Sequence, residues 1–436
     1  MKNKLIKNAI KEIKVARRRF ISIALMAMLG VGFFAGLVSS APDMKESMDK
    51  YLDNTYTFDI SITSILGFTL EDVDKINNIE DIENAYGIKS KDCIFEIEES
   101  DYVAKFIEYN SKINDVVIIE GRNIQNSSEC LASSRFMKQH EYKIGEVITL
   151  SDDINAFKND ELTIVGIIQS PVYLSTTSNA GNTNIGKGTL DSYIYTAGDN
   201  FNLNYYTTIY ANVKGAKELN TDTEEYTKLI DKVKLDVENV RGESKKAIWT
   251  IQDRTDNAGY KSLTESIESI NNLSKVFPII FYVIAVLISL TSMTRMIEEE
   301  RIEIGTLKAL GYGNSKIMFK YLLYSFLACI IGGVIGMFLT FKLIPSIIWN
   351  IYEILYYVPE FLTPFRANYG LMGLLIASIC ICGATIFASI NELRNMPCSL
   401  MRPKPPKRRK KSFLRKNKFY MEKVKIFTKS NCKKFI

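Results

Sequence analysis

The sequence predicts a membrane protein with four transmembrane α-helices, arranged one plus three, and a large α+β extracytoplasmic domain inserted between helices 1 and 2. Two observations lead to this fold class. Four apolar runs carry no charged residue for about 20 positions, the length of helix that crosses the hydrocarbon of a bilayer. Between the first two runs, residues 42–275 are polar and acidic, with 40 Asp and Glu against 24 Lys and Arg. A chain of 436 residues is long enough for both parts.

The apolar runs give the expected order of segments. Transmembrane helices are predicted at residues 20–41, 276–295, 317–345 and 369–391. The other segments are a basic amphipathic arm at 1–19, the extracytoplasmic domain with a stalk at 42–275, a charged segment at 296–316, an aromatic loop at 346–368 and a basic tail at 392–436. The first run follows basic residues as a secretory signal does, but its length favours an uncleaved anchor.

The distribution of charge predicts the orientation of these helices. Residues 1–19 carry eight Lys and Arg against one acid, and the tail from Pro397 carries fifteen against one. Basic segments stay in the cytoplasm, so we expect a multi-pass protein of the cell membrane with both termini cytoplasmic and residues 42–275 extracellular. The formal net charge of +6 is the sum of strongly basic termini and an acidic middle region, and it does not indicate nucleic-acid binding. The basic tail is expected to face anionic lipid.

Sequence patterns in the outer domain indicate mixed α and β structure. Alternating or β-branched runs predict strands at 58–61, 102–109, 116–119, 147–150 and 162–168. A capped helix is predicted after Thr69 and a charged amphipathic helix at 221–240. The stretch 172–204 is rich in Ser, Thr, Asn and Gly and is predicted to be a mobile loop or a solvated edge.

Two further patterns concern the membrane boundary and leave alternatives open. Leu263, Ile267, Ile270 and Leu273 repeat at helical spacing before the second apolar run, which fits a stalk continuous with the membrane helix or ordinary packing under the domain. The aromatic residues of 347–365 fit an interfacial lid or an ordinary aromatic belt.

The chain lacks the residues of common catalytic and metal sites. It has one histidine, His140, and no GxSxG, HExxH or P-loop motif, so we expect no metal, no cofactor and no enzymatic activity of its own. A membrane-tethered enzyme is therefore the least favoured alternative. Cys93 and Cys130 share the outer domain, and a disulfide between them is left open.

The charged segment between the second and third runs is the most informative part of the chain. Residues 295–316 read RMIEEERIEIGTLKALGYGNSK, too polar for lipid and regular enough for a short helix. An apolar stripe is expected to contain Ile302, Ile304, Leu307 and Leu310, with Glu303 and Lys308 beside it. Such a helix is suited to bind a partner, although it could also be a connector on the membrane surface.

Small residues in two of the runs indicate close helix contacts. Gly32 and Gly36 in the first run, and Gly332 and Gly336 in the third, are spaced as small-xxx-small pairs. We treat these four glycines as candidate helix-packing positions, although such pairs also occur by chance.

Several motifs resemble ABC-transporter permeases of the FtsX-like and MacB-like type. They are RRRFISIALMAMLGVGFFAG at the first run, the pair IGEVITL and LTIVGII at 144–150 and 162–168, WTIQDRTDNAGY at 249–260, IGTLKALGY at 304–312 and LRNMPCSLMRPKPPK at 393–407. IGTLKALGY is the most specific of them. The resemblance covers nearly the whole length of the chain. In these motifs the chain is similar to the N-terminal half of the long Gram-positive members of the family.

The resemblance implies a non-enzymatic permease subunit driven by a separate ABC ATPase. ATP hydrolysis would move the outer domain, which would export a peptide, extract a lipid-linked molecule or control a cell-wall enzyme; the substrate is not indicated. The resemblance also implies that the segment between the second and third helices contacts the ATPase. The residues assigned to this contact are Glu298, Glu299, Glu300, Arg301, Glu303, Ile304, Gly305, Leu307, Lys308, Leu310 and Gly311.

The end of the sequence departs from the family pattern. Longer relatives continue past PKPPK into a second, similar half, whereas here a very basic tail follows Lys407. Reading residues 415–436 one base later gives a string closer to the family's linker, which suggests a first half shortened by a frameshift. The alternative is a natural four-span subunit that forms a homodimer. A membrane-anchored sensor or scaffold without transport is the other function class left open.

Overall fold

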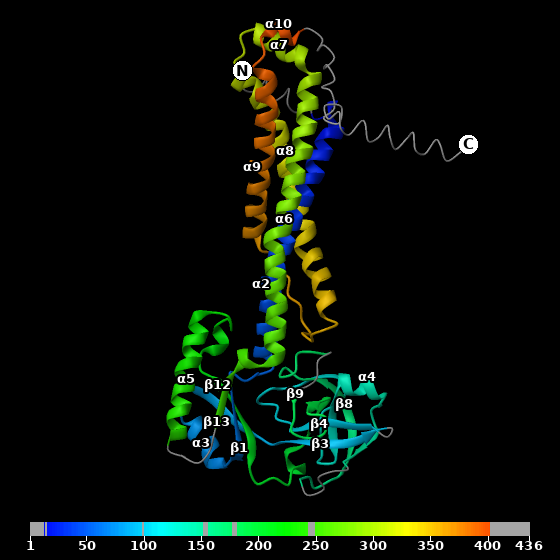
Figure 1. Cartoon of the computed structure of the whole chain (residues 1–436), viewed down its shortest axis with the longest axis vertical. Helices are drawn as coiled ribbons and strands as arrows, with labels where there is room; N and C mark the ends of the chain where they lie inside the picture. Colours follow the sequence, from blue (N-terminus) through cyan, green and yellow to red (C-terminus); the bar gives the residue numbers. More distant parts are fainter. Residues whose placement is uncertain are drawn as a thin grey trace, which may run out of the picture.

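The computed structural model describes residues 13, 15–97, 100–150, 156–176, 181–242 and 249–401. They form a long helical stem that ends in a two-lobed sheet domain (Figure 1). The predicted fold class is confirmed, because four long apolar helices are arranged one plus three around an inserted α+β domain. The predictions for the amphipathic arm before residue 13 and for the tail beyond residue 401 lie outside the described residues.

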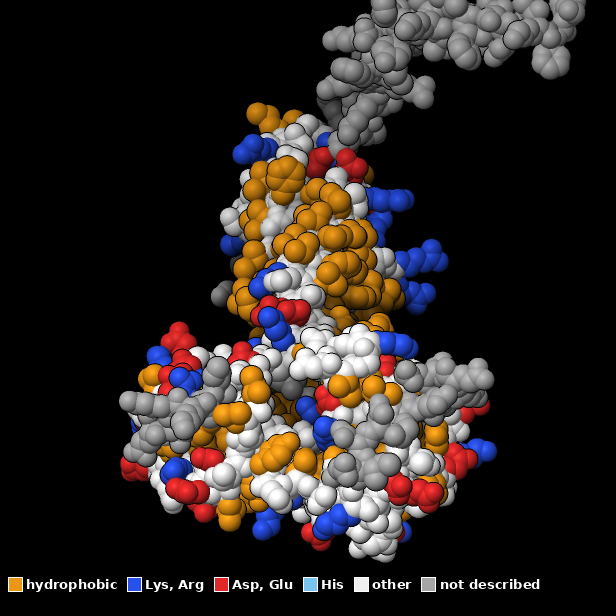
Figure 2. Space-filling view, turned by 60° about the horizontal axis from the view of Figure 1, so that its bottom comes forward, with side chains coloured by type: hydrophobic (Ala, Val, Ile, Leu, Met, Phe, Trp, Pro, Cys, Tyr) orange, Lys and Arg blue, Asp and Glu red, His pale blue; other side chains and the backbone are white. Residues whose placement is uncertain are grey.

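Four helices build the stem, and each is long and apolar enough to cross a membrane. They are α2 (Arg17–Asn54), α6 (Ala258–Glu299), α8 (Asn314–Tyr352) and α9 (Ala367–Leu393). In Figure 2 the stem surface is mostly hydrophobic, whereas charged side chains gather on the sheet domain and at the opposite tip. Lipid tails would cover such an apolar band, and the chain is therefore a multi-pass membrane protein.

Helices α2 and α6 are longer than a bilayer requires. At 1.5 Å per residue, their 38 and 42 residues make rods of about 57 and 63 Å, roughly twice the hydrocarbon thickness. Their outer parts therefore extend toward the sheet domain. The stretch predicted as a stalk is the first part of α6, in one helix with the second apolar run, with Leu263, Ile267 and Ile270 buried and Leu273 exposed.

The first lobe of the outer domain is an antiparallel sheet in the order β13–β1–β12–β2. Its strands are β1 (Ile60–Phe68), β2 (Ile82–Ile88), β12 (Tyr206–Val213) and β13 (Trp249–Asp253). Helices α3 (Leu70–Asn77) and α5 (Glu224–Gly242) pack apolar side chains against it. The start of α3 follows from Thr69, which forms a capping box with Asp72. Both stalk helices join this lobe directly, α2 through β1 and α6 through β13.

The second lobe is a mixed sheet in the order β3–β4–β11–β6–β8–β5, with β7 paired to β8. Its strands are β3 (Ser90–Ile97), β4 (Ser100–Glu108), β5 (Val117–Gly121), β6 (Glu129–Ser133), β7 (Val147–Thr149), β8 (Glu161–Gln169) and β11 (Ser192–Thr196). The motif pair IGEVITL and LTIVGII forms the antiparallel ladder of β7 and β8, in which Ile148 faces Leu162. Cys93 and Cys130 are both buried, and no disulfide joins them.

The remaining elements are short. They are α4 (Ser134–His140), β9 (Gly181–Asn182), β10 (Thr189–Leu190), η1 (Gly198–Asn200), η2 (Ala216–Glu218), η3 (Arg254–Asp256), α7 (Arg301–Ala309) and α10 (Pro397–Leu400). The two lobes share an apolar interface that includes Phe58 and Tyr210 from the first and Val165 and Tyr195 from the second. Helices α7 and α10 lie at the far tip of the stem (Figure 1).

Candidate functional site

The charged segment forms a hairpin at the tip of the stem. Helix α6 ends at Glu299, α7 follows at once, and α8 begins at Asn314. The turn after α7 uses Gly311, whose φ of 85° belongs to the left-handed region that suits glycine. Its N–H donates to the carbonyl of Lys308, and the N–H of Tyr312 donates to that of Leu307 over 3.0 Å. This is a Schellman motif, which ends α7 and turns the chain into α8.

Lys320 on α8 holds the glutamates at the start of this hairpin. Its ammonium group is 3.1 Å from a carboxylate oxygen of Glu300 and 3.1 Å from one of Glu303, and its side chain is nearly fully buried. The hydroxyl of Tyr321 donates to the same Glu300 oxygen over 2.8 Å. A buried ammonium group needs such partners, because removing it from water is costly. This lysine cluster fixes α7 to the beginning of α8.

The two cationic residues of α7, Arg301 and Lys308, attach this helix to the end of α9. The Arg301 guanidinium lies 3.1 Å from the Glu392 carboxylate, and both side chains are largely buried. The Lys308 ammonium donates to the carbonyls of Leu393 and Asn395 over 2.6 and 2.9 Å. Those carbonyls lie at the C-terminus of α9, where a cation is favoured by the helix dipole.

Helix α10 packs closely on α7 at Gly305. A Cβ placed at Gly305 would lie 3.1 to 3.3 Å from Met401, Leu400 and the backbone of Pro397, so a larger residue would press on α10. At the end of α6, Glu299 pairs with Arg19 of α2 over 2.6 Å. The hairpin is therefore attached to α2, α8, α9 and α10.

These contacts divide the residues that the sequence assigned to partner binding. Glu299, Glu300, Arg301, Glu303 and Lys308 all have internal partners, and Glu298 also takes part in an interaction within the chain. The expected apolar stripe is split: Ile304 is buried and Leu307 partly buried against the helices, whereas Ile302 and Leu310 are 66% and 71% exposed. The stripe divides because α10 and the neighbouring helices cover one side of α7.

The sequence did not point to Lys320, Tyr321 or Glu392. The only signal was that Lys320 directly precedes an uncharged run, where a lysine has few ways to reach water. The exposed side of α7 carries Ile302, Thr306 and Leu310, and we call it the tip face. Among the described residues no group of three or more His, Cys, Asp or Glu side chains is placed to hold a metal ion.

The four candidate helix-packing glycines all lie where α2 meets α8. A Cβ on Gly332 would collide with the carbonyl of Ala24, and one on Gly336 with that of Met28. Gly32 and Gly36 face Thr340 and Ile344 in the same way, with Cβ distances of 2.8 and 2.7 Å. The Thr340 hydroxyl donates to the carbonyl of Gly32 over 2.8 Å. The two backbones therefore approach as closely as small residues allow.

A buried charge cluster lies where the stalk enters the first lobe. The Arg254 guanidinium is 3.1 Å from Asp59 and 3.6 Å from Asp53, and it donates to the carbonyls of Thr57 and Phe58. Asp49 on α2 accepts a hydrogen bond from Thr221 over 3.0 Å. Burial raises the pKa of Asp49 from 3.8 to about 6, against the Thr221 hydrogen bond and the charge of Arg254.

Comparison with known proteins finds a family match for part of the stem. Residues 275–398 match the family described as "FtsX-like permease C-terminal". Among solved structures, the extracellular domain of the noncanonic ABC-type transporter YknZ from Gram-positive bacteria is similar at 11% identity, with 44% of this chain and 99% of that chain covered and a TM-score of 0.28. The periplasmic region of MacB from Actinobacillus actinomycetemcomitans is similar at 8% identity, with 50% and 95% covered and a TM-score of 0.29. No curated protein matches the chain.

The helices and sheets described above define the fold independently of these two similar structures. The family match spans the membrane part of α6 together with α7, α8, α9 and part of α10, the elements that build the tip and most of the stem. Residues 275–398 thus match the C-terminal part of FtsX-like permeases, in agreement with the resemblance that the sequence motifs indicated.

Proposed function

We propose that the chain is the permease subunit of an ABC transporter and that a separate cytoplasmic ATPase docks on the tip face. The observation that carries this proposal is the exposure of Ile302 and Leu310 on α7. The charged residues of this segment form ion pairs with α8 and α9, on the side away from the tip face. Apolar side chains kept in water on a fixed helix are suited to enter a groove of a partner. The ATPase would supply the nucleotide-binding motif that the printed sequence does not contain.

The charge distribution supports a cytoplasmic position for the tip. The basic residues 1–19 lead into α2 and include its first residues, and α2 begins at the end of the stem that carries α7, whereas the acidic region 42–275 contains the lobes at the opposite end. By the positive-inside tendency, the tip faces the cytoplasm and the two lobes lie outside.

The contacts around α7 support mechanical coupling as the mode of action. A displacement of α7 would be passed to α8 through Lys320 and to α9 through Arg301 and Lys308. Residues 20–41, 276–294, 321–341 and 369–391 contain no charged side chain, whereas paths for ions or protons through a membrane usually do. In this proposal the outer domain is the driven part, and no pore through the stem is required.

Substitution of the tip face tests the proposal. The full chain is purified from its native membrane, and the ATP-binding-cassette subunit that accompanies it is identified and quantified. We expect Ile302→Asp with Leu310→Asp to weaken the association by about tenfold or more, because each carboxylate would be buried without a partner in the complex. Ile65→Asp, at an even more exposed apolar position in the outer domain, is the control and should leave the association unchanged.

Two results would overturn the proposal. If the double variant folds and binds the ATPase as the unaltered chain does, the tip face is not the docking site. If no such ATPase accompanies the unaltered chain, the sensor or scaffold alternative gains support instead.

A further inference from the structure

The loop between α8 and α9 pairs with the outer domain. The N–H of Thr176 donates to the carbonyl of Leu355 over 2.9 Å, and the N–H of Tyr357 donates to that of Leu174 over 3.0 Å. Between these bonds, Ser175 and Tyr356 face each other as an isolated antiparallel bridge. In Figure 1 the gold loop after α8 runs down toward the sheet domain. We call residues 354–357 with 174–176 the clasp.

Most aromatic residues around this loop pack against protein, whereas Phe365 is 51% exposed. Tyr356 is 6% exposed, and its hydroxyl lies 2.7 Å from the Ser262 hydroxyl and 3.1 Å from that of Ser266, both on α6. Trp349 stacks on Phe361 with ring centroids 5.0 Å apart. These contacts fix the clasp against the stalk as well as against the lobe.

The rest of the loop is attached to α2. The N–H of Leu362 donates to the Ser47 hydroxyl over 2.8 Å, and Arg366 pairs with Asp43 over 2.7 Å and with Glu46 over 2.6 Å. The loop is therefore attached to its neighbours along its length. A movement of the outer end of α8 would be passed on through the loop to the residues that it contacts.

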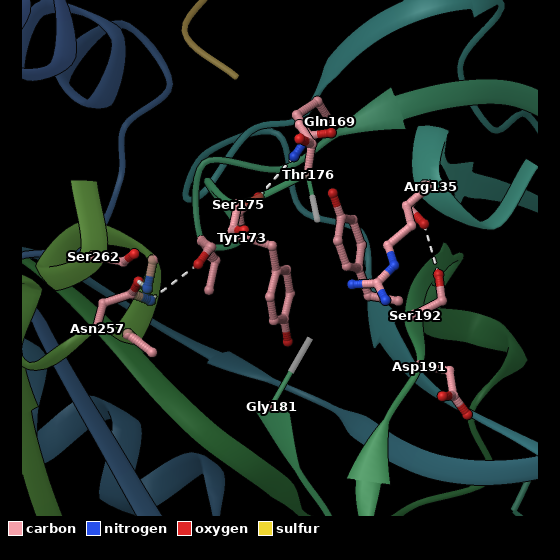
Figure 3. Close-up of a pocket in the computed structure, with 15 residues that line it drawn as sticks. Arg135, Gln169, Tyr173, Ser175, Thr176, Gly181, Asp191, Ser192, Asn257 and Ser262 are labelled. Carbon is pink, nitrogen blue, oxygen red and sulfur yellow. Dashed lines mark hydrogen bonds between the residues drawn. The ribbon is translucent and has the colours of Figure 1, made fainter. Parts of the chain in front are cut away.

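A cavity lies on the other side of the clasp (Figure 3). Tyr173, Ser175 and Thr176 line it from the segment after β8, and Asn257 and Ser262 line it from the start of α6. The Asn257 amide donates to the carbonyl of Val172 over 3.0 Å across this junction. The segment thus borders this cavity on one side, whereas on the other side Leu174 is buried in an apolar cluster with Leu263 and Tyr356, which holds the clasp together.

The connectivity gives the clasp a distinct role. Both stalk helices enter the first lobe, whereas residues 174–176 follow β8, which belongs to the sheet of the second lobe. Helix α8 is attached to α7 at its inner end by Lys320 and to the second lobe at its outer end by the clasp. A shift of α8 relative to the stalk would therefore move the second lobe relative to the first.

We propose that the clasp is a third mechanical connection, beside α2 and α6, through which α8 moves the second lobe, and that Tyr356 is its positioning residue. The inference rests on the proposed ATPase coupling, and it adds a path that ends on a different lobe. The clasp stays closed during the movement, since its function is to transmit displacement.

The test measures movement between the lobes in the full chain with its ATPase. Fluorophores on unnatural amino acids at Ile65 in the first lobe and Lys138 in the second report the distance by single-molecule energy transfer, without nucleotide and with trapped ATP. Thr176→Pro with Tyr356→Phe breaks the clasp, because it removes one backbone donor, the Thr176 hydroxyl bond to Ile354 and the Tyr356 hydroxyl. We expect the ATP-dependent distance change to fall by half or more. Tyr352→Phe, which keeps the clasp, is the control and should show the full change.

A disulfide lock provides a second variant, in which a covalent bond keeps the clasp closed. Ser175 and Tyr356 form the non-hydrogen-bonded pair of the bridge, for which Cα atoms lie about 4.5 Å apart, within the range of a disulfide. In Ser175→Cys with Tyr356→Cys we expect the full distance change when the disulfide is oxidised and a smaller change when it is reduced, because the reduced variant lacks the Tyr356 hydroxyl. A full change in the broken variant, or a change abolished by oxidation, would overturn the inference. If no ATPase associates with the unaltered chain, that result would contradict the proposed function instead.

Discussion

At the scale of single residues, Lys320 determines how firmly the tip is held. Its ammonium group pairs with two glutamates, Glu300 and Glu303. Glu300 also accepts a hydrogen bond from the hydroxyl of Tyr321. Removing one partner from such a cluster leaves the remaining charges poorly solvated, which costs more than the cluster itself contributes.

The substitution Lys320→Met tests this role. We expect it to lower the stability of the full chain by about 2–3 kcal/mol, less than for a fully buried pair because Glu303 is half exposed. Thermal unfolding in detergent, followed by tryptophan fluorescence, would measure the change. Lys316→Met removes an exposed lysine one turn earlier and should stay within about 0.5 kcal/mol. Equal stabilities of the two variants would contradict the role given to Lys320.

Asp49 gives a pH-dependent prediction at the same scale. Burial raises the pKa of Asp49 to about 6 in the folded chain, compared with 3.8 for an aspartate in water. The folded state therefore binds the proton more tightly than the unfolded state, and ionisation of Asp49 lowers stability as the pH rises from about 4 to 6. Asp49→Asn removes this loss. Relative to the unaltered chain, the variant should gain up to about 3 kcal/mol between pH 4 and pH 7.5. A stability difference that does not change with pH would exclude this effect of Asp49.

At the scale of elements, the contact of α2 with α8 depends on glycine. Gly332 and Gly336 place their Cα atoms against the carbonyls of Ala24 and Met28, and a methyl group has no space there. Overpacking of this kind forces backbones apart, and the loss of contacts spreads along both helices.

Gly332→Ala is expected to destabilise the chain by about 1–3 kcal/mol, since α2 and α8 must separate. Gly383→Ala on α9 is the matched control, because no atom lies within 4 Å of its added Cβ, and alanine favours a helix. It should be neutral or stabilising. Thermal unfolding of the two variants side by side measures the difference, and an equal loss in both would show that helix contact at Gly332 is unimportant.

The elements also show which features the sequence could predict. The four membrane helices were predictable because an uncharged run of about 20 residues has few other uses. The two faces of α7 were not, because Ile304 becomes buried through α10, which is about 95 residues further along the chain. Likewise, the stretch 172–204 was predicted to be a mobile loop or a solvated edge, but residues 174–176 pair with the distant loop after α8 and residues 192–196 form the buried strand β11.

At the scale of the whole molecule, the stem joins two ends with different chemistry. The tip combines an exposed apolar face with buried ion pairs, and the outer end combines two sheets with three attachments to the stem. Strand order explains why this organisation could not be predicted: β1 pairs with β12 and β13, which follow it by more than a hundred residues. Such pairings depend on the folded chain and leave no local pattern.

The central claim is that an ATPase acts on this molecule at the tip face. Photo-crosslinking tests it most directly, with a photoreactive amino acid at Thr306, between Ile302 and Leu310, and a control at Leu371 on the lipid-facing side of α9. We expect a crosslink from position 306 to the ATP-binding-cassette subunit and none from position 371. An ATPase that accompanies the chain but is never crosslinked from positions 302, 306 or 310 would contradict it.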